Sequence, residues 1–243
     1  MISDAAKLLV RRGLTRLDLS IGRDPQHARL ARTLAALDLT AVLDIGANVG
    51  QYAGLLRIGG YAGRLVSCEP LSAAYGELAA RAAKDPAWTP VRTAVGAAEG
   101  TATIHVAGNS QSSSLLPMRQ SHVDADPSSA IVGSEEVPVT TVRDLVDVHD
   151  LDPARTLLKV DTQGFESAVL DGAGDLLSDF AAVQLELSYV PLYDGQVLAD
   201  ELLTRVFEAG FAFWSIEPGF AGPDGRLLQA DALLVRRDLV PAG

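Results

Sequence analysis

The sharpest chemical signal in the sequence is a glycine-rich run between a predicted strand and a predicted helix. The run spans residues 44–50 and has the sequence DIGANVG. Gly46 lacks a Cβ, so it allows a tight turn and a close approach of the backbone to a ligand. Asn48 tolerates unusual backbone angles and offers a donor and an acceptor, and Gly50 allows close packing of the helix on the strand. The run is typical of a ligand-binding turn, and a plain tight turn is the alternative.

The acidic residue that opens this run distinguishes it from the G-x-G-x-x-G run of dinucleotide enzymes. A carboxylate from Asp44, at the tip of the first strand, would face a pyrophosphate unfavourably. It suits a ligand that carries an ammonium and a sulfonium. Asp44 therefore favours a cationic ligand and argues against a nicotinamide cofactor.

A second carboxylate follows the next predicted strand, which covers residues 64–70 with the sequence RLVSCEP. Glu69, at the end of that strand, could accept hydrogen bonds from both hydroxyls of a ribose. Its alternative role is that of a solvated residue at a strand end. Pro70 restricts the turn that follows. Together with the glycine-rich run, Glu69 predicts a nucleoside-containing ligand.

Strands and helices alternate along the chain, as judged from the period of the apolar residues. This order predicts βαβ units and a mostly parallel sheet of about seven strands with helices on both faces. The last two strands, FAFWSIEP and LLQADALLVRR, have no helix between them, so we expect a hairpin that leaves one antiparallel strand at the sheet edge. Residues 107–136 are polar and without period, which predicts a long loop. Such sheets bind ligands at the carboxyl ends of their strands.

Composition and charge narrow the classes of function. The chain has 243 residues, of which 48% are hydrophobic and 21% are charged, as in a globular protein with a sizeable core. Its net charge of -11 argues against broad binding of nucleic acid. The single cysteine, Cys68, cannot form an internal disulfide, and no segment predicts a membrane span. We therefore expect a cytoplasmic protein.

The chain divides into two predicted parts. Residues 1–37 are expected to form an N-terminal helical segment that acts as a lid or as the contact of a homodimer, and residues 38–243 are expected to form the main domain. Within the first part, HARLARTLAALD has leucines at helical spacing.

Over roughly residues 38–235 the sequence resembles the FkbM family of S-adenosylmethionine-dependent O-methyltransferases. The matching segments are LDIGANVGQY, SCEP, AVG, VPVTTVRDL and LLKVDTQGFESAVLDGA. In the last segment Gln163 stands where the family commonly has Glu. The resemblance implies a class I methyltransferase (Rossmann-like) α/β fold, with a mostly parallel seven-stranded sheet, a C-terminal antiparallel hairpin and helices on both faces.

The resemblance also implies the position of the cofactor, S-adenosylmethionine. The glycine-rich run would line its methionine end and Glu69 its ribose, and the AVG segment would flank the adenine with apolar walls. The expected cofactor-binding residues are Asp44, Gly46, Ala47, Asn48, Gly50, Glu69, Pro70, Ala94, Val95 and Asp161.

Methyl transfer from a sulfonium to an alcohol is an in-line displacement, and the alcohol needs a general base or a metal. Asp161 ends the strand TLLKVD and is the first candidate for base, metal ligand or orienting group. Glu186 lies in the strand AAVQLELS and could hold Mg²⁺ together with Asp161, or could instead pair with Lys159. His122, in the long loop, is a further candidate base.

The expected acceptor is a hydroxyl of a sugar, of a glycolipid or polysaccharide precursor, or of a polyketide-type metabolite. The serine-rich stretch over residues 109–116 would suit a polyol, and Tyr193 and Trp214 could stack on a sugar. A nicotinamide-dependent oxidoreductase and a non-catalytic module that binds S-adenosylmethionine are the alternatives.

Overall fold

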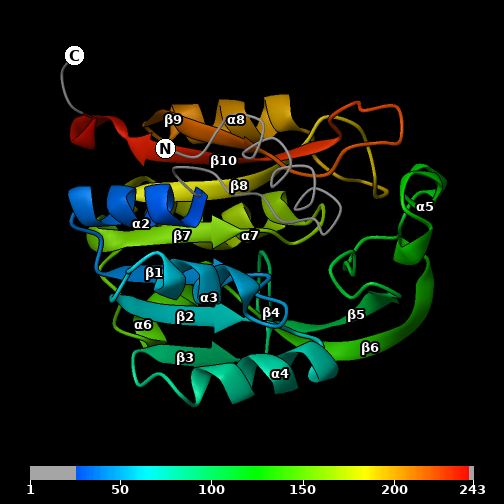
Figure 1. Ribbon diagram of the computed structural model, residues 1–243, viewed down its shortest axis with the longest axis horizontal. Helices are drawn as coiled ribbons and strands as arrows, with labels where there is room; N and C mark the ends of the chain where they lie inside the picture. The colour runs from blue at the N-terminus through cyan, green and yellow to red at the C-terminus, as the bar shows by residue number, and fades with distance from the viewer. Residues whose placement is uncertain (1–25, 241–243) are drawn as a thin grey trace, which may run out of the picture.

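A seven-stranded sheet forms the centre of the protein, in a computed structural model that describes residues 26–240 (Figure 1). The strands are parallel except for one, which confirms the predicted class of α/β fold. In order across the sheet they are β3 (Trp88–Val91), β2 (Arg64–Cys68), β1 (Ala41–Ile45), β7 (Thr156–Val160), β8 (Ala182–Ser188), β10 (Gln229–Arg236) and β9 (Phe211–Pro218).

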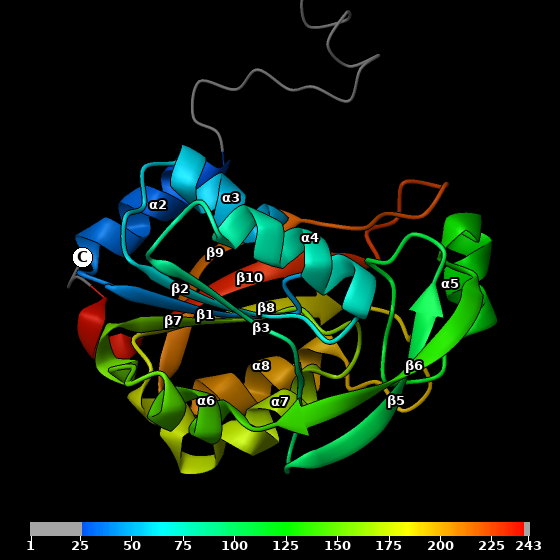
Figure 2. The ribbon, with the colours of Figure 1, turned by 90° about the horizontal axis from the view of Figure 1, so that it is seen from below.

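Helices cover both faces of this sheet (Figure 2). One face carries α2 (Gln26–Ala36), α3 (Gln51–Ile58) and α4 (Ser72–Ala82), and the other carries α6 (Val142–Val148), α7 (Glu166–Ala173) and α8 (Ala199–Glu208). Because both faces are covered, every residue of β1 and β7 is buried. Short 3₁₀ helices occupy Pro127–Ser129, Pro153–Arg155, Gly174–Asp179 and Arg237–Leu239.

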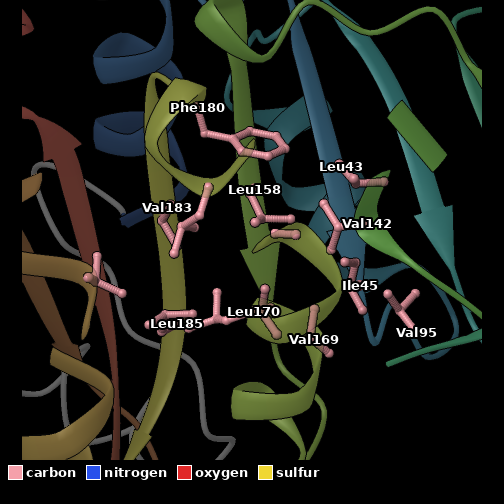
Figure 3. Close-up of a cluster of buried hydrophobic side chains, with 14 of the residues drawn as sticks. Leu43, Ile45, Val95, Val142, Leu158, Val169, Leu170, Phe180, Val183 and Leu185 are labelled. Atoms are coloured by element: carbon pink, nitrogen blue, oxygen red, sulfur yellow. The ribbon is translucent and has the colours of Figure 1, made fainter. Parts of the chain in front are cut away.

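The two faces of the central strands differ in chemistry. Toward α6, α7 and α8 the strands present apolar side chains such as Leu43, Leu158 and Leu185, which belong to one buried cluster with Phe180 (Figure 3). The alternate residues point to the α2–α3 face, where Asp44 and Lys159 lie in register on neighbouring strands. The alternation of side chains along each strand therefore separates an apolar layer from a layer that carries charge.

The structure corrects the predicted place of the antiparallel strand. β10 is antiparallel to both β8 and β9 and lies between them, so β9 forms the edge. Most of β10 is buried, whereas most of β9 is exposed. β10 has a neighbouring strand on each side, whereas β9 pairs on one side only, so the inner strand of the hairpin is the more buried of the two.

A second sheet occupies part of the region that the sequence predicted to be a long loop. It contains, in order, β4 (Ala94–Val95), β6 (Ile131–Thr140) and β5 (Gly100–Ala107), and α5 (Gln120–Ala125) lies between β5 and β6 in the chain. The prediction of a loop over residues 107–136 is therefore wrong for α5, for the short helix at Pro127–Ser129 and for the residues from Ile131 onward. Most of the β6 residues are exposed, so the strand lacks the apolar alternation that marks a half-buried strand.

The N-terminal part is described only from residue 26 onward. Helix α2 buries Leu34 in the same apolar cluster as Leu56 of α3, and Arg29 forms an ion pair with Glu217 of β9. The lid or dimer contact predicted for residues 1–37 falls mostly outside the described residues and stays a prediction. Between residues 26 and 240, no helix is both long enough and apolar enough to cross a bilayer.

The apolar layer beneath β7 and β8 should dominate stability. We expect Phe180→Ala to lower the free energy of unfolding by about 3–5 kcal/mol, because the fully buried ring leaves a cavity. The matched control is Val148→Ala at an exposed position, with an expected change within about 0.5 kcal/mol. Denaturant unfolding of both variants measures the difference, and equal midpoints would contradict this account of the core.

Candidate cofactor and acceptor site

A cavity of about 400 Å³ lies at the carboxyl ends of β1, β2 and β7. Its walls come from the glycine-rich turn, from the residues after β2, from β4, from residues 110–115 and from the loop after β7. Of the residues expected to bind the cofactor, those that line the cavity are Gly46, Ala47, Asn48, Glu69, Pro70, Ala94, Val95 and Asp161.

The glycine-rich turn passes close to the end of β7. A Cβ on Gly46 would lie 1.7 Å from the backbone oxygen of Asp161, and the φ of Gly46 is 79°. Asn48 also has a positive φ, of 46°, and its backbone N–H donates to Glu69 at 2.8 Å. Gly50 faces Trp88 and Leu78 and does not line the cavity, so its role is close packing. The turn thus depends on glycine for space as well as for backbone angle.

Glu69, directly after β2, places a carboxylate in the cavity that can accept hydrogen bonds. Its two carboxylate oxygens accept hydrogen bonds from the backbone N–H groups of Asn48, at 2.8 Å, and Leu71, at 2.9 Å. Burial nevertheless raises the pKa of Glu69 to about 7. The side chain is therefore held in one orientation, with lone pairs left for a ligand hydroxyl.

The structure places Asp44 in a buried layer beside the cavity, and its expected role toward the cofactor stays a prediction. This carboxylate is fully buried and does not line the cavity. It forms an ion pair with the Lys159 ammonium, with 3.1 Å between Oδ1 and Nζ, and accepts a hydrogen bond from the Ser67 hydroxyl at 3.0 Å. Side chains alternate along β1, so Asp44 points beneath the glycine-rich turn rather than into the cavity. Its charge is paired with that of Lys159 within the protein.

The candidate catalytic carboxylates do meet in the cavity. Asp161 and Glu186 both line it, and Gln163 lies between them. The Gln163 amide nitrogen, Nε2, lies 3.0 Å from Asp161 Oδ1 and 3.0 Å from both carboxylate oxygens of Glu186. The other Asp161 oxygen faces Lys159 Nζ at 3.4 Å, and Gln229 donates to Glu186 at 2.7 Å. Glu186 is therefore held by two amides, and Lys159 pairs with Asp44 and Asp161.

These residues do not fit the expected Mg²⁺. The ion requires oxygen ligands at about 2.0–2.1 Å in octahedral geometry. Here N–H donors already occupy the space between the carboxylates, because Gln163 donates to both of them. Among residues 26–240, no three His, Cys, Asp or Glu side chains form a group that could hold a metal.

The structure places His122 away from the walls of the cavity. It lies in α5 and is buried, rather than in a solvated loop, and it does not line the cavity. Its ring packs edge-on against Tyr193, with 5.2 Å between centroids, and burial lowers its pKa. Tyr193 is itself fully buried, so it cannot stack on a sugar. Trp214 lies on the exposed strand β9, beside a smaller hollow of about 110 Å³.

The structure adds two groups that the sequence analysis missed. Gln51 follows the glycine-rich run and lines the cavity, and its side-chain oxygen is buried without a hydrogen-bond partner among the described residues. Lys159 lines the cavity from within β7 and donates to the backbone oxygen of Gly46 at 3.1 Å. Position directly after the turn was the one available signal for Gln51, whereas Lys159 appeared in the sequence only as a partner for Glu186.

The cavity has the hydrogen-bond acceptors and the apolar walls that S-adenosylmethionine needs. Glu69 can accept from ribose hydroxyls, and Ala94 and Val95 offer an apolar slot for the adenine. The unpartnered Gln51 oxygen can accept a hydrogen bond from the ammonium at the methionine end. These residues therefore fit the cofactor that the resemblance implies.

Solved structures of methyltransferases resemble this fold at low sequence identity. A TehB-like S-adenosylmethionine-dependent methyltransferase from Corynebacterium glutamicum has 11% identity and a TM-score of 0.45, over 96% of this chain and 97% of that chain. An rRNA methylase from Streptococcus thermophilus has 10% identity and a TM-score of 0.45, over 89% and 98%. The METTL16 methyltransferase domain has 10% identity and a TM-score of 0.49, over 89% and 70%.

The family assignment comes from the sequence of the domain itself. No curated protein matches the chain significantly. Residues 44–213 of the 243 match the methyltransferase FkbM domain, which includes the glycine-rich turn, Glu69 and the carboxylate cluster. This match confirms the resemblance found in the sequence and shows that the protein is a methyltransferase. The chain belongs to the FkbM methyltransferase family.

Proposed function

We propose that this protein transfers a methyl group from S-adenosylmethionine to a hydroxyl group, with Asp161 as the general base. One observation carries the proposal. A single cavity is lined by Glu69, which can accept hydrogen bonds from the ribose of the cofactor, and by Asp161, whose side chain is 32% exposed. A carboxylate that is both held and accessible can take a proton from an acceptor in the same cavity.

The residues of this chain divide the work of binding between them. Glu69 accepts hydrogen bonds from the ribose, Ala94 and Val95 enclose the adenine, and the turn from Gly46 with Gln51 holds the methionine end. When bound, the cofactor supplies a methyl group activated by the positive sulfonium. The protein adds orientation, since a nucleophile must approach along the axis of the bond that breaks.

The part of the cavity wall that comes from the serine-rich stretch favours a hydroxyl-rich methyl acceptor. This wall consists of Ser110, Gln111 and Ser113, and the Asn48 side chain donates to the Ser110 hydroxyl at 3.2 Å. Hydroxyls and amides of this kind can hydrogen-bond a polyol. We therefore propose a sugar, a glycolipid or polysaccharide precursor, or a polyketide-type metabolite as acceptor.

The negative charge of the cavity argues against a nucleic acid as the methyl acceptor. Asp161, Glu186 and Asp231 all line the cavity, and the chain as a whole has a net charge of -11. A surface of this sign repels phosphate groups. An uncharged methyl acceptor would not be repelled in this way.

Removal of the base should lower turnover strongly and leave the binding of the cofactor intact. We expect Asp161→Asn to lower kcat by about 10²–10⁴-fold, because the amide cannot accept the hydroxyl proton as a base. Transfer of labelled methyl groups to a panel of hydroxylated sugars measures kcat, and thermal stabilisation by S-adenosylhomocysteine reports binding.

The control for this experiment is Asp171→Asn, an exposed residue of α7 that pairs with Arg205. It should leave turnover unchanged. An Asp161→Asn variant with the rate of the unaltered protein would refute the assignment of the base. A protein stabilised by S-adenosylhomocysteine but inactive on every acceptor would instead support the non-catalytic alternative.

Glu69 should make cofactor binding depend on pH. Its pKa is raised to about 7, so the ionised form that accepts from the ribose becomes more abundant as the pH rises through that value. We expect S-adenosylhomocysteine to bind more tightly at about pH 8 than at about pH 6. Glu69→Gln should weaken binding by about 10-fold, or about 1.4 kcal/mol, and flatten this dependence.

Titration calorimetry at several pH values tests this expectation. Glu77→Gln, at an exposed position of α4, is the matched control and should keep the pH dependence. The role of Glu69 is wrong if its Gln variant binds as tightly as the control at every pH.

A further inference from the structure

We propose that the Gln163 side chain takes the place of a divalent cation between Asp161 and Glu186, and so acts as a positioning residue in a metal-independent site. This inference rests on the proposed function, because it assigns Asp161 as the base. It concerns how two partly buried carboxylates stay side by side without a metal.

The position of the amide nitrogen carries the inference. Gln163 Nε2 is 3.0 Å from Asp161 Oδ1, and it is also 3.0 Å from Oε1 and from Oε2 of Glu186. A primary amide has two N–H bonds, one for each carboxylate. The nitrogen therefore stands where a cation that bridges the two acids would stand.

The orientation of the amide is determined by its neighbours. Its oxygen lies 3.0 Å from the Tyr193 hydroxyl, whose single proton is shared between this oxygen and the backbone oxygen of Ser112, at 2.8 Å. Tyr193 is fully buried, so this hydroxyl has a fixed place. If the amide were flipped, its oxygen would face the carboxylates of Asp161 and Glu186, which cannot donate to it when ionised. Its N–H groups would then point away from both carboxylates.

The backbone at Gln163 is also held in an uncommon conformation. Its φ is 55°, in the left-handed region that a residue with a side chain seldom adopts. The Ser114 hydroxyl donates to its backbone oxygen at 2.7 Å, and Glu166 accepts from the flanking N–H groups of Thr162 and Gly164 at 2.8 and 3.2 Å. Strain of this kind persists where surrounding contacts enforce it. The loop thus delivers this one amide to the carboxylates.

The amide has a clear electrostatic task. Burial and the nearby charge of Asp161 raise the pKa of Glu186 well above its ordinary value, and donation from Gln163 opposes that rise. Without a donor between them, the two carboxylates would repel each other at close range. With the donor in place, Asp161 keeps its orientation toward the acceptor hydroxyl.

Replacement of the Gln163 amide by a carboxylate distinguishes an amide bridge from a metal site. Gln163→Glu would place three carboxylates around one point, which is a set of ligands that Mg²⁺ and Mn²⁺ accept. We expect Mn²⁺ to raise the Tm of this variant saturably and to leave the Tm of the unaltered protein unchanged. This measurement needs no activity and no acceptor.

Kinetics tests the positioning role. The unaltered protein should keep full activity in EDTA, whereas Gln163→Met, of similar size but without a donor, should lose about 10- to 100-fold in kcat at an unchanged KM. Added Mn²⁺ should not restore it. Should Gln163→Met fail to fold, Tyr193→Phe removes the hydroxyl that orients the amide and should lower kcat in the same way.

Several outcomes would overturn the inference. They are loss of activity in EDTA with recovery on Mg²⁺, stabilisation of the unaltered protein by Mn²⁺, or an unchanged kcat in Gln163→Met. Failure of the proposed function would look different: the unaltered protein would then show no stabilisation by S-adenosylhomocysteine, whatever the response to metals.

Discussion

The candidate site depends on one buried cation. The Lys159 ammonium lies between Asp44 and Asp161, at 3.1 and 3.4 Å, and also donates to the backbone oxygen of Gly46. Burial opposes its charge, but the two carboxylates outweigh that effect and raise the pKa of Lys159 above its ordinary value. Loss of either carboxylate would leave an incompletely matched charge in the interior, so the three residues form one unit.

This unit connects the two strands that deliver the site. Asp44 belongs to β1 and Lys159 to β7, and the residues are direct partners in the parallel ladder. Ser67 of β2 extends the row, since it donates to Asp44 and accepts from the Trp88 ring nitrogen at 3.0 Å. The carboxyl ends of these strands are therefore joined below the cavity by polar contacts that a buried layer must satisfy.

Asp161 and Glu186, the two carboxylates that face the cavity, are likewise matched by groups of the protein. One oxygen of Asp161 faces the Lys159 cation and the other faces the Gln163 amide. Glu186 has amide donors on both oxygens, from Gln163 and Gln229. Each acid is supported by donors of the protein itself, and the Gln163 amide stands between them, where a bridging metal would have to lie. The site is thus suited to proton transfer and orientation, in an FkbM methyltransferase whose acceptor is proposed from the polar groups around it.

Local patterns were sufficient for much of the fold and for part of the site. The alternation of strands and helices, the left-handed glycine turn and the places of Glu69 and Asp161 at strand ends all follow from residues near one another in the chain. The exposed first half of β6 was predicted as loop because its stability comes from pairing with β5 rather than from an apolar face.

Long-range contacts decided the rest. The partner of Asp44 is on β7, the partners of Gln163 are on β8 and in the loop around Tyr193, and the burial of His122 depends on Tyr193 and Phe220. The types of these residues predicted that they could do chemistry. What each charge or amide does was settled by the tertiary structure, because electrostatic and hydrogen-bond roles belong to pairs of groups, and the fold alone determines which groups become neighbours.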